Sequence, residues 1–308
     1  MKYILFALLA FAGNAMAQTP QAACGKIVHI EKFATALVEP RNVDIWLPEG
    51  YDSGKKYAVL YMHDGQNLFD TTMTWNKQAW NVDDISCKLL KAGKLKDLIV
   101  VGIWNSPQKR QSDYFPQKPL EGLSTLAKDS ISNQLKSRGG PSATASSAAF
   151  QPNADNYLKF IVTELKPFID KNYSVYTDME HTFMSGSSMG GLISIYAICE
   201  YPEVFSGVAC LSTHWLGTFD PKNPFPDAFV RYLRNKLPNP GNHKIYFDHG
   251  DLTLDASYPP FQKKVDETMK TKGYNQQNWE TLLFKGMDHS EKSWRARFEI
   301  PLLFLLGK

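Results

Sequence analysis

The chain has 308 residues, and its 34 lysines and arginines nearly balance its 31 aspartates and glutamates, giving a formal net charge of +3 at pH 7. Because these charges are interspersed, the sequence argues against a nucleic-acid-binding surface or a polybasic patch for membranes. The length allows one large hydrophobic core, and α/β folds of this size commonly form single domains. We therefore expect one domain over residues 18–308.

The first 17 residues have the features of a signal peptide. Lys2 precedes the apolar run Tyr3–Ala12, and Ala15–Ala17 supplies the small-x-small pattern that signal peptidase recognises. The apolar run is too short for a stable membrane span. A retained N-terminal anchor is the alternative, and Cys24 lies too far beyond the motif to favour a lipoprotein. We expect removal of residues 1–17 on export, to the periplasm or the medium.

Strand-like and helix-like segments alternate along the rest of the chain. The expected strands are short and apolar, many of them rich in β-branched or aromatic residues: Lys26–Phe33, Val43–Leu47, Tyr57–Met62, Leu98–Ile103, His181–Met184, Gly207–Leu211, Lys244–Phe247 and Trp279–Phe284. The expected helices are Trp80–Leu90, Asn156–Ile169 (with Asp155 as its cap), Met189–Glu200, Pro226–Lys236, Phe261–Lys272 and Glu291–Phe298. This alternation predicts an α/β fold with a mostly parallel sheet covered by helices on both faces.

One segment departs from this alternation. Residues 137–151 are small and polar and offer little to bury. Because the strand–helix series continues on both sides, we interpret them as a flexible surface insertion and not as a linker between domains.

The four cysteines show none of the spacings that bind a metal, and no metal site is expected. Export permits a disulfide, and we predict the pair Cys24–Cys87. Cys199 and Cys210 each lie inside an apolar segment, which favours free, buried thiols.

Gly186–Gly190 forms a G-x-S-x-G sequence around Ser188. In this motif the serine occupies a strained turn between a strand and a helix, and the glycines allow the backbone to pack closely there. A glycine-rich turn without catalytic function is the alternative. The strand expected before Ser188 and the apolar helix after it favour a nucleophile.

A nucleophilic serine needs a base, and in folds with this motif an acid and then a histidine follow it along the chain. Of the histidines that lie far enough past Ser188, His289 follows the last expected strand, where catalytic groups collect, whereas His249 lies within or at the end of a strand. Three aspartates compete for the acid, and the pattern alone leaves them open: Asp248, Asp251 and Asp255.

An oxyanion hole requires two backbone N–H donors. The residue after the nucleophile, Met189, supplies the first, and the loop His63–Asn67 supplies the second, with Gln66 as the expected donor. The alternative for this loop is an ordinary Asp-Gly turn.

Four motifs in the right order resemble those of the putative esterase family of the α/β-hydrolase superfamily: YMHDGQNLFD (Tyr61–Asp70), VVGI-x-N…R…DYFP (Val100–Pro116), GSSMGG (Gly186–Gly191) and GMDHS…W (Gly286–Trp294). That family includes esterase D-like enzymes, feruloyl and acetyl-xylan esterases of carbohydrate esterase family 1, and enterochelin esterases. The resemblance implies Ser188 and His289 as catalytic residues and the amides of Gln66 and Met189 as oxyanion donors. It also favours Asp255 as the acid.

Several further residues could contact a substrate. Trp215 and His214 follow a strand on the catalytic side and could line a pocket for an acyl group or a sugar, as could Trp75, Trp80 and Trp104, although core packing is the commoner role of tryptophan. Arg110 could bind a substrate carboxylate, but we interpret it as an ion pair with Asp113.

The resulting hypothesis is a serine esterase that needs no cofactor and acts on a small-molecule or carbohydrate ester. Two alternatives are an acyltransferase of the same fold and an inactive hydrolase-like binding protein. Measuring how the acyl product divides between water and an added sugar distinguishes the acyltransferase from an esterase. Failure to react with any serine-directed probe would favour the inactive binding protein.

Overall fold

The computed structural model describes residues 19–136 and 150–308. The predicted signal peptide and residues 137–149 of the predicted insertion lie outside the described residues. Within the described ranges, no helix is long and apolar enough to cross a membrane.

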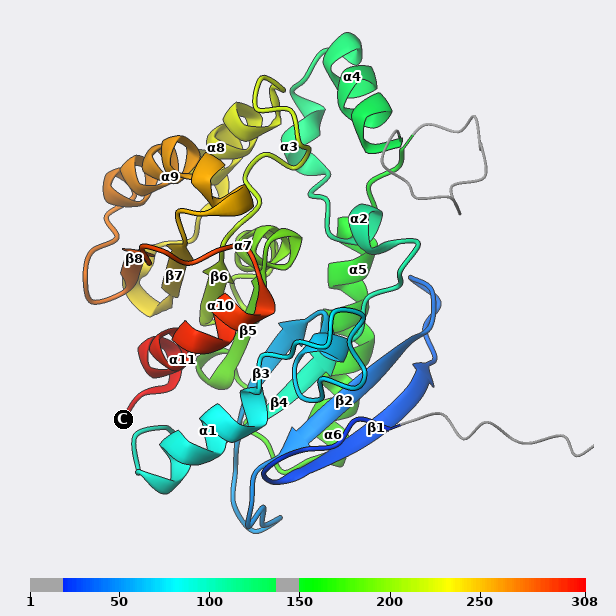
Figure 1. Ribbon diagram of the computed structural model, residues 1–308, viewed down its shortest axis with the longest axis vertical. Helices are drawn as coiled ribbons and strands as arrows, with labels where there is room; N and C mark the ends of the chain where they lie inside the picture. Colours follow the sequence, from blue (N-terminus) through cyan, green and yellow to red (C-terminus); the bar gives the residue numbers. More distant parts are fainter. Residues whose placement is uncertain (1–18, 137–149) are drawn as a thin grey trace, which may run out of the picture.

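Eight strands form one sheet in the order β1-β2-β4-β3-β5-β6-β7-β8. Their bounds are β1 Lys26–Phe33, β2 Arg41–Leu47, β3 Ala58–His63, β4 Leu98–Ile103, β5 Thr182–Ser187, β6 Gly207–Leu211, β7 Lys244–His249 and β8 Trp279–Leu283. Only β2 pairs antiparallel with its neighbours β1 and β4, and all other pairs are parallel. The carboxyl ends of β3 to β8 therefore meet at one edge, where the loops that carry the candidate site begin (Figure 1).

Helices cover both faces of the sheet (Figure 1). Their bounds are α1 Val82–Lys91, α2 Arg110–Asp113, α3 Lys118–Glu121, α4 Thr125–Lys136, α5 Ala154–Phe160, α6 Lys166–Asn172, α7 Met189–Glu200, α8 Phe225–Lys236, α9 Pro259–Thr271, α10 Glu291–Arg297 and α11 Glu299–Leu306. The central strand β3 shows how one sequence supplies two cores. Val59 and Tyr61 pack into one hydrophobic cluster with α5 and α7, whereas Leu60 and Met62 pack into a second with α1, α10 and α11. Alternation with a period of two sends successive side chains to opposite faces.

The predicted strands and helices are confirmed to within three residues at each end. The expected helix Asn156–Ile169 is longer and contains a π-helical turn, Ile161–Leu165, between α5 and α6. Asp155 does not cap it, because the N-cap is Asn153, and the Asp155 carboxylate accepts a hydrogen bond from the Tyr196 hydroxyl instead. Helices α2, α3, α4 and α11 were not predicted.

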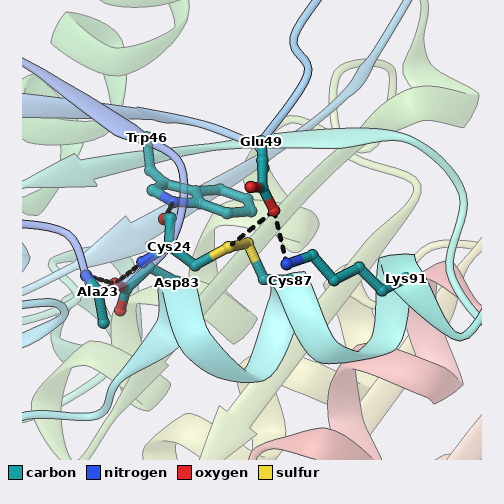
Figure 2. Close-up of a disulfide and its surroundings, with 7 residues drawn as sticks. All are labelled: Ala23, Cys24, Trp46, Glu49, Asp83, Cys87 and Lys91. Atoms are coloured by element: carbon teal, nitrogen blue, oxygen red, sulfur yellow. Dashed lines mark hydrogen bonds and ion pairs between the residues drawn. A yellow bond between two sulfur atoms is a disulfide. The ribbon is translucent and has the colours of Figure 1, made fainter.

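The disulfide Cys24–Cys87 is confirmed and ties the segment before β1 to α1 (Figure 2). Asp83 in the first turn of α1 accepts the amides of Ala23 and Cys24, and the Trp46 indole N–H donates to the Cys24 carbonyl at 2.7 Å. The N-terminal segment is thus fixed by covalent and polar contacts together. Cys199 and Cys210 are free and buried, as predicted.

Candidate active site

Ser188 lies in the turn between β5 and α7. Its backbone has φ 57° and ψ −121°, a conformation that costs free energy for any residue with a side chain. A Cβ atom on Gly186 would lie 2.8 Å from the carbonyl carbon of Gly190, so close contact across the turn requires glycine at position 186. Met189 is the first residue of α7, where backbone N–H groups have no partner within the helix.

His289 and Asp255 are brought together from two loops. Asp255 lies in the 3-10 turn Thr253–Ser257 after β7, and His289 lies in the loop after β8. The Asp255 Oδ1 atom is 2.5 Å from His289 Nδ1, and the Thr253 hydroxyl accepts the His289 amide at 2.9 Å. The carboxylate therefore orients the ring so that Nε2 is the nitrogen available to react.

The Asp255 carboxylate is fully buried and fully hydrogen-bonded. Its Oδ2 atom accepts the Ser212 hydroxyl at 2.6 Å and the Gly250 amide at 2.7 Å. Burial alone would raise the pKa of Asp255, but the bonds from His289, Ser212 and Gly250 outweigh it and hold the pKa below its ordinary value. The group is thus an anion at neutral pH.

The two competing aspartates have other partners. Asp248 forms a buried ion pair with Arg297 at 2.9 Å, and the burial raises its pKa. Asp251 accepts the Gly286 amide at 2.7 Å. The structure therefore resolves the choice that the sequence pattern left open, in favour of contact between Asp255 and His289. His249 Nδ1 donates to the Gly250 carbonyl, and the side chain is buried at the end of β7, as interpreted.

The loop after β3 is held rigidly near Ser188. Asp64 has a left-handed backbone, and its carboxylate takes two hydrogen bonds from Arg110, each 2.7 Å, and one from the Asn105 amide at 2.6 Å. A Cβ on Gly65 would meet the backbone of β4 at 2.6 Å, so only glycine fits there. The Gln66 side chain accepts the Asn105 backbone amide, which fixes the residue whose own amide is the expected oxyanion donor.

The predicted ion pair of Arg110 with Asp113 is wrong. Arg110 pairs with Asp64, and Asp113 pairs with Arg41 at 2.8 Å in the core. Although burial works against it, the charge of Arg110 and the bonds from Arg110 and Asn105 lower the pKa of Asp64. The arginine therefore braces the candidate oxyanion loop.

A cleft of about 540 Å³ contains these groups. Ser188, His289 and Gln66 line it, and Trp75, Trp80 and Trp294 give it an aromatic wall. Trp75 is 88 % exposed, which is unusual for so large an apolar side chain. The cleft is therefore polar at its reacting end and aromatic along one side.

Trp215 and His214, which were expected to line the substrate pocket, lie beneath it instead. Each is 2 % exposed. The Trp215 indole N–H donates to Gln262, and its ring packs against Phe229 and Phe247 in the core. The His214 Nδ1 atom is 3.0 Å from the Tyr258 hydroxyl. Neither side chain is placed to touch a substrate in the cleft.

Sequence reasoning missed Ser212, which follows β6. Its hydroxyl donates to Asp255 and accepts hydrogen bonds from Arg297 at 2.7 Å and from the Trp294 indole at 3.0 Å. Its backbone φ of 43° lies in the left-handed region, and only its place at the carboxyl end of a strand could have drawn attention to it. Among the described residues, no group of three or more His, Cys, Asp or Glu side chains could hold a metal ion.

Comparisons with known proteins identify the family and show similar folds. A family model described as putative esterase matches residues 34–304. The uncharacterized protein YbbA of Bacillus subtilis is 24 % identical over 276 residues, which cover 87 % of this chain and 93 % of YbbA. The endo-1,4-beta-xylanase/feruloyl esterase of Xylanibacter ruminicola is 24 % identical over 89 % of this chain and 30 % of its own length. The crystal structure of the enterobactin esterase from Shigella flexneri superposes with a TM-score of 0.63 at 15 % identity, over 93 % of this chain and 60 % of that one.

Proposed function

Because the chain belongs to the putative esterase family, whose reaction is the hydrolysis of carboxylic esters, we propose that it is an exported serine esterase that forms an acyl-enzyme on Ser188. One observation carries the proposal. The strained Ser188 lines the same cleft as His289, whose Nδ1 atom is 2.5 Å from a buried carboxylate. This combination is what nucleophilic catalysis by serine requires.

The reaction proceeds in two halves. The Ser188 Oγ attacks the ester carbonyl carbon while His289 Nε2 takes its proton, and the amides of Gln66 and Met189 stabilise the oxyanion. Collapse of this intermediate expels the alcohol, which receives the proton from His289. A water then gives its proton to His289 and attacks the acyl carbon, and Ser188 leaves with that proton as the acid is released.

The aromatic wall of the cleft supports an acyl group or sugar with a flat face as part of the substrate. Trp75, which is 88 % exposed, offers a face on which such a group stacks, whereas Trp80 and Trp294 line the cleft but are nearly buried. The name of one similar protein, the endo-1,4-beta-xylanase/feruloyl esterase, refers to an ester of an aromatic acid. We propose aromatic acyl esters, including those on carbohydrates, as the substrate class.

The disulfide supports export. Disulfides form and persist in oxidising compartments and are rare in the cytosol of ordinary cells. The Cys24–Cys87 bond closes a loop of 63 residues close to the expected start of the mature chain. N-terminal sequencing of the protein from the periplasm or medium should begin at Gln18, and a chain that keeps Met1 in the cytosol would contradict export.

The activity is tested with Ser188→Ala and a matched serine control. Ser185 lies on β5, the strand that precedes Ser188, and its hydroxyl has no hydrogen-bond partner among the described residues. Ser188→Ala should lose more than about 10³-fold in kcat/KM on p-nitrophenyl acetate and methyl ferulate, whereas Ser185→Ala should stay near wild type. Full activity of Ser188→Ala would refute the proposal. Added sugar should not divert the acyl group, and efficient diversion would indicate a transferase.

A further inference from the structure

The Ser212 hydroxyl joins the two elements that carry the candidate acid and base. Ser212 follows β6 and is fully buried. Its oxygen accepts hydrogen bonds from Trp294 and Arg297, which both lie on α10, the helix that begins two residues after His289. The same hydroxyl donates to Asp255 at 2.6 Å. One hydroxyl group therefore ties the helix beside the base to the acid that orients the base.

The direction of the Ser212 proton is fixed by the neighbours of the hydroxyl. A serine hydroxyl has one proton and two lone pairs, and its proton ordinarily rotates to suit the surroundings. The Trp294 indole N–H and the Arg297 guanidinium can only donate, so at 3.0 Å and 2.7 Å they occupy both lone pairs. The proton is left for the Oδ2 atom of Asp255. Ser212 is therefore an obligatory donor to the acid.

Ser212 and Arg297 are both tied to Asp248 on β7. The Ser212 amide donates to the Asp248 carbonyl at 2.8 Å, and Ser212 has φ 43°, a left-handed conformation that is uncommon outside glycine. The Nη2 atom of Arg297, which bonds to Ser212, also donates to Asp248 Oδ1 at 2.9 Å. Because all three residues are buried, movement of any one would leave a polar group without a partner, which costs free energy. The hydroxyl is therefore held in a fixed position.

The donors to Oδ2 decide which carboxylate oxygen of Asp255 faces the base. Ser212 and Gly250 donate to Oδ2, and Oδ1 is left for His289 Nδ1 at 2.5 Å. The last torsion of an aspartate side chain is broad, so the side chain alone does not hold this orientation. We propose that Ser212 is a positioning residue for the acid and the base: its hydroxyl holds the Asp255 carboxylate and α10 where the contact with His289 requires them. The inference rests on the proposed function.

Two substitutions remove the hydroxyl but differ in their effect on the backbone. Ser212→Ala keeps the Cβ atom in the left-handed conformation, whereas Ser212→Gly relieves that strain because glycine adopts a positive φ readily. Arg297 keeps its bond to Asp248 in both variants. Ser194→Ala is the matched control, since Ser194 is also fully buried, lies on α7, and donates its hydroxyl to the Gly190 carbonyl at 2.7 Å.

The experiment measures the second-order rate at which a fluorophosphonate labels Ser188, together with Tm and with kcat and KM on p-nitrophenyl acetate. We expect Ser212→Ala and Ser212→Gly each to lower kcat and the labelling rate about tenfold, equivalent to about 1.4 kcal/mol, with KM little changed. Ser194→Ala should label at the wild-type rate. In an Asp255→Ala background, Ser212→Ala should slow labelling by less than about twofold more, because Ser212 acts through the missing carboxylate.

Three results would overturn the inference. The first is labelling of Ser212→Gly at the wild-type rate, and the second is an equal loss in Ser194→Ala at equal Tm. The third is a further loss of about tenfold when Ser212→Ala is added to Asp255→Ala, since the hydroxyl would then act by another route than the acid. Failure of the proposed function looks different, because the probe would then label a residue other than Ser188 in the wild-type protein.

Discussion

Replacement of Asp255 by asparagine should inactivate the site by changing which nitrogen of His289 carries the proton. Asp255 Oδ2 accepts two donors, the Ser212 hydroxyl and the Gly250 amide, whereas Oδ1 faces His289 Nδ1. The Gly250 N–H cannot turn away, so the asparagine oxygen must stay at the Oδ2 position. Its NH₂ group then faces His289, which has to present a lone pair on Nδ1 and carry its proton on Nε2.

That tautomer cannot accept the proton of Ser188. The equivalent change in a serine protease triad lowers kcat about 10⁴-fold, and we expect a loss of about 10³- to 10⁴-fold here, equivalent to roughly 4–5.5 kcal/mol. Asp248 keeps Arg297 neutralised at 2.9 Å. The free energy of unfolding should therefore fall by only about 1–3 kcal/mol, the range for one disturbed buried hydrogen-bond network.

The assay is kcat/KM on p-nitrophenyl acetate at pH 7.5, with urea unfolding as the measure of stability. Asp251→Asn is the matched control, because Asp251 is partly exposed and its side chain accepts one described hydrogen bond, from the Gly286 amide. We expect that variant within about twofold of wild type. Asp248→Asn should lower the free energy of unfolding by about 3–5 kcal/mol, because it leaves the buried Arg297 without the carboxylate that it pairs with. Retention of activity within tenfold by Asp255→Asn, or an equal loss in Asp251→Asn, would refute this reasoning.

Three further outcomes are expected. Loss of the Cys24–Cys87 bond, by reduction or by serine at both positions, should cost about 4 kcal/mol in urea unfolding, since it opens a loop of 63 residues; an unchanged midpoint would contradict this. Trp75→Ala should lower kcat/KM for a feruloylated sugar about fivefold but leave vinyl acetate nearly unaffected; equal losses would argue against stacking. Burial lowers the pKa of His63 to about 3 despite the nearby Asp64. Below about pH 6.5 the unfolded chain therefore binds a proton that the folded chain does not, so the free energy of unfolding should fall by about 1.4 kcal/mol per pH unit as the pH drops towards 3. His63→Gln should lack this contribution, and an equal pH dependence of stability in His63→Gln and wild type would contradict it.

Features with a local cause could be predicted from the sequence. The turn at Ser188 needs glycine at position 186 because of its close contact with Gly190, four residues away, and the composition of the short apolar strands identifies them. The order of Ser188 and His289 along the chain follows from the order of the strands that carry them. The π-helical turn Ile161–Leu165 has no comparable signal, because its packing against the sheet decides its hydrogen bonds.

Features that depend on distant partners could not be predicted. Asp248 lies near the end of β7, and Asp251 and Asp255 lie in the segment after it. The choice among them depends on distant residues, because Asp248 pairs with Arg297 from α10 and Asp255 contacts His289. Arg110 likewise bonds to Asp64, 46 residues away, and not to its neighbour Asp113. Trp215 follows a strand on the catalytic side, but the direction of its side chain, towards the core, is set by the turn after β6.

The central claim is that Ser188 carries the acyl group. Rapid acid quench of the enzyme during turnover of methyl ferulate or p-nitrophenyl acetate, followed by peptide mass spectrometry, measures this directly. The account predicts an acylated peptide with the group on Ser188, and no acylated peptide in Ser188→Ala. An acyl group on any other residue, or turnover by Ser188→Ala at the wild-type rate, would contradict it.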